Sequence, residues 1–133
     1  MANLKQKYIR MGKFAPEDIL PHITDKKSEL EFDGLRVWMN SDRYRLFKAK
    51  GMTCVICGLT GLFFALERQQ NLTDKSTPCN RFHFNLYGYD KDGNEIMLTK
   101  DHIIPKSKGG KNSIDNYQPM CAVCNEEKGD KIS

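Results

Sequence analysis

The sequence lacks several features that would take it out of the class of ordinary globular proteins. No apolar run approaches the roughly 20 residues that a membrane-spanning helix needs, and the opening stretch MANLKQKYIRMGKF has no apolar core of a secretion signal. The chain has no repeat of 20–50 residues and no low-complexity segment. We therefore expect a single compact cytoplasmic domain without membrane contact, and 133 residues are enough for one modest hydrophobic core.

A large excess of charge of one sign is also missing. The chain carries 21 Lys and Arg against 17 Asp and Glu, a net charge of +4, and residues 1–50 hold 11 of the basic and 7 of the acidic side chains. A basic N-terminal segment suits a polyanionic partner such as nucleic acid. A surplus of this size is equally compatible with an ordinary solvated surface, so charge alone does not choose a function.

Local patterns in the first half predict a mixture of strands and helix. Residues 1–29 are polar and broken by prolines, which favours a loosely attached arm or a short helix. Asp33-Gly34 is a strong two-residue hairpin turn between β-prone flanks. Residues 40–51 predict a short helix that Ser41 caps at its start.

The second half predicts a longer hairpin. Residues 61–69 lean towards a strand, and the polar residues 69–80 predict a loop. Apolar residues alternate with polar ones over 81–102 on both sides of Asp92-Gly93, a pattern typical of two strands and a tight turn. A short helix is expected after the last cysteine pair. The fold class predicted is therefore α+β.

Four of the five cysteines form two Cys-x-x-Cys pairs, Cys54 with Cys57 and Cys121 with Cys124. Two thiolates at this spacing reach one ion from a tight turn, and two such pairs complete a closed tetrahedral Zn²⁺ site. In a reducing compartment these pairs more often hold metal than disulfides. The ion would join distant parts of the chain, because 63 residues separate the pairs. Cys79 has no partner at ligand spacing, and we expect no metal role for it.

The stretch TKDHIIPKSKGG places an acid beside a histidine. Hydrolysis of a phosphodiester needs a base that activates water, and a histidine near neutral pKa suits that task. It also needs neutralisation of phosphoryl charge, for which a hard divalent cation is the usual source. Asp101 offers a carboxylate oxygen and Asn125 an amide oxygen, which are the ligands that Mg²⁺ prefers.

Asp101 and His102 can converge on one site only if the strand that carries them ends at these residues, because neighbouring residues of a strand point to opposite faces. Pro105 fits such an end, since it breaks the pairing of a strand. Lys128, three residues after Asn125 on the expected helix, would lie on the same side as that ligand. Taken singly, these residues also have ordinary interpretations. The Asp-His step fits a surface pair, Asn125 fits a helix cap, and the lysines fit solvated side chains. Three lysines of the turn are available to phosphates: Lys106, Lys108 and Lys111.

The whole run DHIIPKSKGGKNSIDNYQPMCAVCNEEKG resembles the ββα-metal motif of HNH endonucleases, in the branch bracketed by two Cys-x-x-Cys pairs. The resemblance covers residues 54–58 and 101–129. It implies a small ββα-metal core with a structural four-cysteine zinc site, and the sequence patterns add a β-hairpin and an N-terminal helical or extended arm. We expect residues 1–50 to form an arm, hairpin and short helix packed on the core, and residues 51–133 to form the nuclease domain with its zinc knuckles.

The resemblance also implies roles for particular residues. Asp101 and Asn125 would hold a catalytic Mg²⁺ or Mn²⁺, His102 would be the general base, and Asn116 would brace the loop that holds His102. From the residue pattern itself, and not from the resemblance, we expect Lys128 to belong to the catalytic set and the three turn lysines to bind nucleic acid. Asn125 stands where the family has a final His or Asn, so the pattern here is His-Asn-Asn.

The activity implied is metal-dependent nicking or cleavage of double-stranded DNA, leaving 5′-phosphate and 3′-hydroxyl ends. The enzyme would act as a monomer or homodimer in a bacterial or phage-infected cell, because short members of this branch are frequent in phage and mobile-element genomes. The 43 residues between Cys57 and Asp101 exceed a minimal family member. We interpret this insertion and the basic arm as DNA-binding additions.

A second hypothesis is a zinc-knuckle module that binds nucleic acid or protein and does no chemistry. It accounts for the cysteines and for the basic N-terminal segment. It leaves Asp101, His102 and Asn125 without a function, and cleavage of DNA by the purified protein would separate the two hypotheses.

Overall fold

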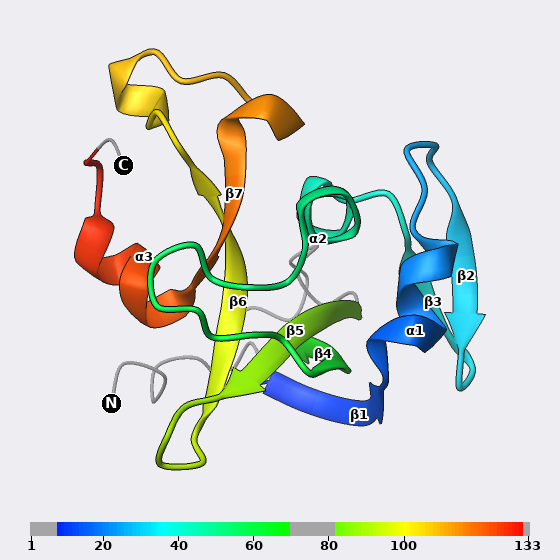
Figure 1. The fold of residues 1–133 in the computed structure, drawn as a ribbon. Helices are drawn as coiled ribbons and strands as arrows, with labels where there is room; N and C mark the ends of the chain where they lie inside the picture. Colours follow the sequence, from blue (N-terminus) through cyan, green and yellow to red (C-terminus); the bar gives the residue numbers. More distant parts are fainter. Residues whose placement is uncertain (1–7, 70–81, 132–133) are drawn as a thin grey trace.

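A five-stranded antiparallel sheet with the strand order β1-β4-β5-β6-β7 forms the centre of the molecule (Figure 1). The structure is a computed structural model and describes residues 8–69 and 82–131. The mixed α+β class expected from the sequence is confirmed. Most of the loop predicted over 69–80, together with Cys79, lies outside the described residues.

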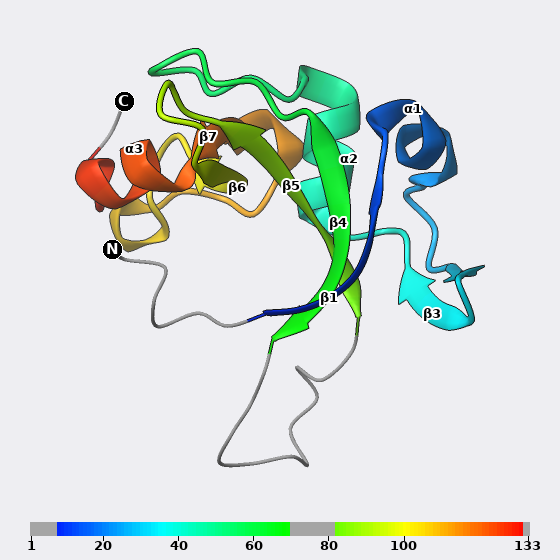
Figure 2. The ribbon, with the colours of Figure 1, turned by 90° about the horizontal axis from the view of Figure 1, so that it is seen from below.

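The five strands of this sheet are β1 (Tyr8–Phe14), β4 (Phe63–Gln69), β5 (His83–Tyr89), β6 (Glu95–His102) and β7 (Tyr117–Cys121). A separate hairpin consists of β2 (Glu29–Phe32) and β3 (Leu35–Trp38). The α-helices of the described residues are α1 (Pro16–Ile19), α2 (Asp42–Lys50) and α3 (Ala122–Lys128). In both ribbon views α3 lies at one end of the molecule, and α1 with the small hairpin lies at the other (Figures 1 and 2). None of the described helices has the length and apolar character needed to cross a membrane.

Strand β1 corrects the expectation of a loosely attached arm for residues 8–14. These residues pair along β4 as an edge strand of the main sheet, with a register shift between Arg10 and Gly12. The Arg10 guanidinium donates to the carboxylate of Glu67 at 2.6 Å and to that of Glu95 at 2.8 and 3.1 Å. The sequence pattern missed this strand because Arg10 reads as an ordinary surface charge, whereas its guanidinium is paired with carboxylates of β4 and β6.

Glu67 makes this edge sensitive to substitution. Its side chain is only 1% exposed, and its Oε1 also accepts hydrogen bonds from Asn85 Nδ2 at 2.8 Å and from the Tyr87 hydroxyl at 2.6 Å. Removing one partner of a buried ion pair costs about 3–5 kcal/mol, because a charge is left without compensation. Arg10 is itself partly exposed, so part of that cost is screened by solvent.

Arg10→Met is therefore expected to lower the free energy of unfolding by about 2–3 kcal/mol, measured by urea denaturation. Lys13→Met is the matched control, because Lys13 is half exposed and lies 3.9 Å from Glu95. The control is expected to change stability by less than about 1 kcal/mol. Equal effects of the two substitutions would contradict a structural role for the Arg10–Glu67 pair.

The two local turn and cap predictions of the first half are confirmed. Asp33 and Gly34 both have positive φ angles, 51° and 81°, as the tight hairpin turn between β2 and β3 requires. The Ser41 hydroxyl accepts a hydrogen bond from the Tyr44 backbone N–H at 3.2 Å and so caps α2. Helix α2 ends at Gly51, whose φ is 98°. The longer hairpin of β5 and β6 is confirmed as well.

Helix α2 connects the N-terminal elements to the sheet. Tyr44 and Phe47 are buried in the main hydrophobic core, and the Tyr44 hydroxyl accepts from the Phe84 backbone N–H of β5 at 2.7 Å. At the end of the helix, Lys50 Nζ donates to the Tyr117 carbonyl of β7 at 2.8 Å. The core also contains apolar side chains from α1, β3 and four strands of the sheet, among them Ile19, Val37, Phe64, Leu66, Phe84, Leu86, Leu98 and Met120.

Strands β6 and β7 and helix α3 bring the candidate residues together. The β6–β7 ladder runs from Leu98 opposite Cys121 to His102 opposite Tyr117. Helix α3 begins directly after Cys121 and packs against both strands. The chain thus places the second cysteine pair at one end of this ladder and the Asp-His pair at the other.

Candidate functional site

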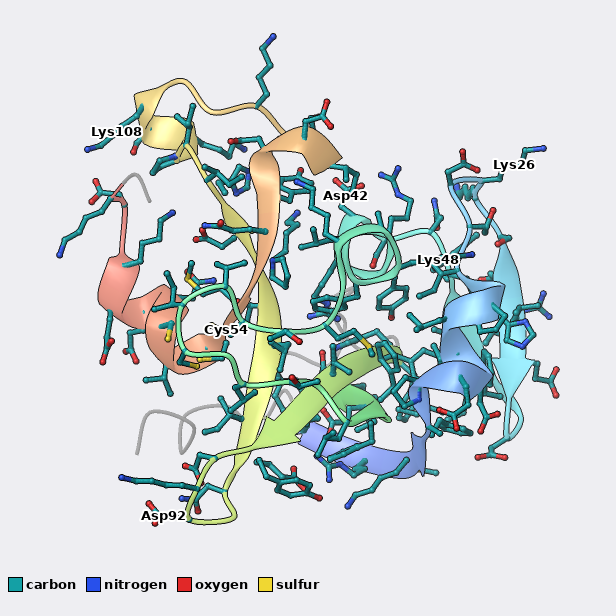
Figure 3. The ribbon with its side chains drawn as sticks, in the orientation of Figure 1. Lys26, Asp42, Lys48, Cys54, Asp92 and Lys108 are labelled. Atoms are coloured by element: carbon teal, nitrogen blue, oxygen red, sulfur yellow. The ribbon has the colours of Figure 1, made fainter. Side chains whose placement is uncertain are left out.

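The four paired cysteines come together in space. Their Sγ atoms all lie within 4.8 Å of one another, and sulfur atoms gather beside Cys54 where the loop after α2 passes α3 (Figure 3). The Sγ atoms of Cys57 and Cys121 are 3.7 Å apart. A tetrahedral ion with zinc–sulfur bonds of about 2.3 Å requires sulfur separations of about 3.8 Å. The cluster therefore has the dimensions of a metal site closed by four thiolates.

Each cysteine pair is shaped by its local backbone. In the first pair, the Cys54 carbonyl accepts from the Gly58 N–H at 3.0 Å, and Gly58 has a φ of 82° that favours glycine. The Val55 N–H donates to the Pro119 carbonyl at 3.1 Å, which attaches this turn to β7. In the second pair, Cys121 ends β7, and its Sγ accepts from the Cys124 N–H at 3.4 Å as the cap of α3.

The surroundings of the four cysteines do not favour ionisation of all four thiols unless a cation is bound. Burial raises the pKa of the Cys54 thiol, but hydrogen bonds from backbone N–H groups outweigh it and lower this pKa to about 6. Burial also raises the pKa of Cys124, and in that case hydrogen bonds with the other thiols raise it further. One thiolate is thus favoured by the backbone, whereas ionisation of its neighbours requires a bound positive charge.

Asp101 and His102 are the last two residues of β6, and their side chains leave the strand on opposite faces. Asp101 pairs across the ladder with Gln118, and its Oδ2 accepts from Gln118 Nε2 at 3.0 Å. His102 pairs with Tyr117, and the two rings meet edge to face with centroids 5.0 Å apart. The strand ends where the sequence predicted, but the imidazole and the carboxylate have separate surroundings.

The Asp101 carboxylate is buried against α3. Lys128 Nζ donates to its Oδ2 at 2.9 Å and to the His102 carbonyl at 2.6 Å. The two charged side chains are only 7% and 6% exposed. Within the described part of the chain, both hydrogen bonds to this carboxylate go to Oδ2, so Oδ1 is left as the oxygen with open acceptor capacity.

Asn125 is oriented in a similar way. Its Nδ2 donates to Thr99 Oγ1 at 2.7 Å, and that hydroxyl in turn donates to the Met120 carbonyl at 2.7 Å. Thr99 and Asp101 lie two residues apart on β6 and therefore share one face of the strand. The amide nitrogen is thus attached to the sheet, and the Asn125 Oδ1 remains the acceptor of this side chain.

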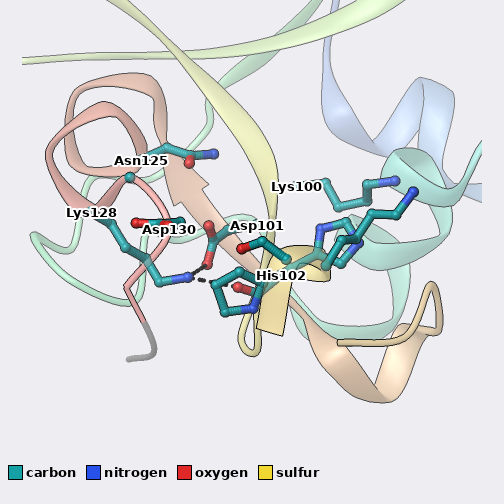
Figure 4. A pocket seen from close by; sticks show the side chains of 10 residues that line it. Lys100, Asp101, His102, Asn125, Lys128 and Asp130 are labelled. Carbon is teal, nitrogen blue, oxygen red and sulfur yellow. Dashed lines mark hydrogen bonds and ion pairs between the residues drawn. The ribbon is translucent and has the colours of Figure 1, made fainter. Parts of the chain in front are cut away.

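A cavity of about 300 Å³ lies at this end of β6. Figure 4 shows Lys128 reaching Asp101 from α3, with Asn125 and Asp130 on the same side and Lys100 pointing the other way. Side chains at the end of β6 and side chains from α3 and the residues just after it thus line one pocket. Its lining residues are Lys100, Asp101, His102, Pro105, Lys106, Ser107, Asn125, Lys128, Gly129 and Asp130.

The His102 ring has its own hydrogen-bond partner. Its Nε2 lies 2.8 Å from Asn112 Oδ1. An amide oxygen can only accept, so this bond requires the proton on Nε2 and leaves the lone pair on Nδ1. Tyr117, on which the ring rests, is buried and donates its hydroxyl proton to Asp42 Oδ2 at 3.2 Å.

The loop between β6 and β7 is closed by Asn116. Its Nδ2 donates to the Ile104 carbonyl at 3.0 Å and to the Lys111 carbonyl at 2.9 Å, and its Oδ1 accepts from the Ile104 N–H at 3.0 Å. Gly110 permits the close crossing of this loop, because a Cβ there would lie 1.6 Å from the Ile104 carbonyl oxygen. All three lysines named for this turn have exposed side chains: Lys106, Lys108 and Lys111.

The structure therefore brings together Asp101, Asn125 and Lys128, and it places His102 at the same cavity with its ring on the other strand face. Sequence reasoning did not find three supporting residues, Thr99, Asn112 and Gln118. Thr99 could have been found from the alternation along β6, because it shares the Asp101 face. Asn112 and Gln118 carry no distinctive signal, since amide side chains are common on loops and strands.

A comparison with models of known protein families matches the part of the chain that carries this site. Residues 90–133 match a family model described as HNH endonuclease, a stretch that includes β6, β7, α3 and the second cysteine pair. Searches of curated proteins and of solved structures found no match. The matched stretch carries Asp101, His102, Asn116 and Asn125 in the order that the sequence resemblance required. Residues 90–133, about a third of the chain, are therefore similar to the HNH endonuclease family.

Proposed function

We propose that this protein is a metal-dependent endonuclease that hydrolyses phosphodiester bonds of double-stranded DNA and leaves 5′-phosphate and 3′-hydroxyl ends. The observation that carries the proposal is the cavity at the end of β6, which Asp101, His102, Asn125 and Lys128 line within the matched stretch. The four-cysteine cluster, proposed as a structural zinc site, lies at the other end of the β6–β7 ladder and has no open position for a substrate.

Asp101 and Asn125 are the proposed ligands of the catalytic metal, Mg²⁺ or Mn²⁺. Each has one polar atom engaged with the protein and one oxygen, Oδ1, with open acceptor capacity. Carboxylate and amide oxygens suit a hard divalent cation that keeps part of its water shell. When bound, that ion would supply charge stabilisation for the phosphoryl and leaving oxygens.

His102 is the proposed general base. With the proton on Nε2 fixed by Asn112, the Nδ1 lone pair is the one that can accept a proton from water. A phosphodiester lying across the end of β6 would meet the Asp101 and Asn125 oxygens on one face and the imidazole on the other. Asn116 supports this role, because its three hydrogen bonds close the loop that follows His102.

Lysines supply the proposed DNA contacts. Lys106, Lys108 and Lys111 are exposed on the loop after β6, and Lys106 also lines the cavity. Phosphate contacts of this kind fix the position of a duplex without reading its sequence. Binding to DNA is therefore expected to weaken steeply with salt.

The test is incubation of supercoiled plasmid with zinc-loaded protein that has been freed of other divalent ions. Addition of Mg²⁺ or Mn²⁺ is expected to convert the plasmid to open circles or linear DNA, and samples without added metal are expected to leave it supercoiled. Asp101→Asn, purified in the same way, controls for a contaminating nuclease. Binding without cleavage under every metal condition would instead support the non-catalytic zinc-knuckle module.

A further inference from the structure

We infer that Lys128 is a built-in cation that competes with the divalent metal for Asp101 and so sets the metal affinity of the site. The inference rests on the proposed function, because it takes Asp101 as a metal ligand. It assigns to Lys128 a role in metal binding and not in phosphate contact. The ammonium group and the metal would share one carboxylate.

The first observation is the position of the lysine. Its Nζ lies 2.9 Å from Asp101 Oδ2 and 2.6 Å from the His102 carbonyl oxygen. Two oxygen atoms of β6 therefore already accept hydrogen bonds from the positively charged ammonium group. The side chain is 7% exposed, which is unusual for lysine and requires a partner. An ammonium group held by a carboxylate and a carbonyl is in the surroundings that a small cation also prefers.

The second observation is that Asp101 and Lys128 neutralise each other. Asp101 is 6% exposed, and a buried carboxylate without a counter-charge is strongly disfavoured. Lys128 supplies that counter-charge in the protein itself, so the carboxylate is compensated before any metal binds. A divalent ion arriving at Oδ1 then meets a positive charge on the same carboxyl group.

The size of the effect follows from Coulomb's law. Two unit charges 4 Å apart repel each other by an energy that is worth a factor of about five in affinity even in bulk water, and a divalent ion doubles that energy. The repulsion is larger in a partly enclosed cavity than in water. Removing the charge of Lys128 is therefore expected to tighten metal binding by at least about tenfold.

The experiment compares Mn²⁺ binding by the zinc-loaded wild-type protein, Lys128→Met and Lys128→Gln, with free Mn²⁺ measured by its electron paramagnetic resonance signal. Lys128→Gln retains a hydrogen-bond donor and so separates loss of charge from loss of packing. Both variants are expected to bind Mn²⁺ at least about tenfold more tightly, and Mn²⁺ is expected to raise their melting temperature more than that of the wild type. Lys108→Met removes the same charge from an exposed lysine and is expected to change the affinity by less than about threefold.

Two controls keep the possible failures apart. Asp101→Ala must lose the site; if it binds Mn²⁺ as the wild type does, the metal does not use Asp101, and both the proposed site and this inference are wrong. If Asp101→Ala loses binding but the Lys128 variants, shown to be folded by circular dichroism, bind Mn²⁺ no more tightly than wild type, the inference alone is overturned. If Lys128→Met does not fold, the Lys128→Gln result decides.

Discussion

His102→Ala is expected to reduce the rate of plasmid cleavage by at least about 100-fold while leaving DNA affinity and melting temperature nearly unchanged. General-base catalysis by a positioned histidine contributes about 10²–10⁴ in rate, and an alanine side chain cannot accept a proton. The fold is expected to tolerate loss of the imidazole, because His102 is partly exposed and its hydrogen bond is to Asn112 of a surface loop, so that one edge-to-face contact with Tyr117 is the packing lost. Rates are measured on supercoiled plasmid with saturating Mg²⁺ or Mn²⁺, and affinity by fluorescence anisotropy of a labelled duplex.

His22→Ala is the matched control for this variant. His22 is exposed in the short 3₁₀ segment after α1, and α1 lies at the opposite end of the molecule from α3 (Figure 1). This control is expected to cut at the wild-type rate. A His102→Ala protein that still cuts at the wild-type rate would show that another group activates the water. A large loss of DNA affinity would show that the ring binds substrate.

Cys121→Ser is expected to have the largest effect on stability of the substitutions considered. A structural zinc site is worth about 10–16 kcal/mol in small peptides, and the net stability of a whole domain is about 5–15 kcal/mol. Cys121 also ends β7 and caps α3 through its Sγ, so its loss weakens the connection between these two elements. We expect the variant to bind less than one zinc ion per chain and to melt more than about 15 °C below wild type, or to lose cooperative unfolding.

Cys79→Ser provides the comparison for this prediction, because Cys79 belongs to neither Cys-x-x-Cys pair. It is expected to retain one zinc ion per chain by elemental analysis and the wild-type melting temperature by circular dichroism. A selective zinc chelator added to the wild-type protein is expected to reproduce the Cys121→Ser result. Unchanged zinc content and melting in Cys121→Ser would exclude the four-thiolate site.

Local features of this fold could be predicted from short stretches of sequence. The Asp33-Gly34 turn depends on two residues that tolerate positive φ, and the start of α2 depends on one hydroxyl and one backbone N–H. The cysteine cluster was predictable for a similar reason, because the spacing within each pair already determines that its two thiolates can bind one ion. In each case the information lies within a few residues.

Long-range pairings could not be predicted in this way. Strand β1 is held by β4, whose paired residues lie 50 to 61 positions further along the chain, and by the Arg10–Glu67 pair, which reads in the sequence as two ordinary surface charges. At the candidate site, the residue types of Asp101 and Asn125 were informative, but their orientations depend on Gln118 and Thr99. The strand register alone determines that the His102 ring faces Tyr117 and not Asp101.

The sulfur cluster has a consequence for the size of the smallest fragment that can hold the candidate site. The family match begins at residue 90, yet two of the four thiols and the lysine attached to the Tyr117 carbonyl belong to residues 50–57. A helix as short as α3 has little stability of its own, so we expect its position to depend on the cysteine cluster that joins it to that earlier segment. The recognisable motif is therefore not transplantable by itself, and a truncated or grafted version must also include α2 and the loop that follows it.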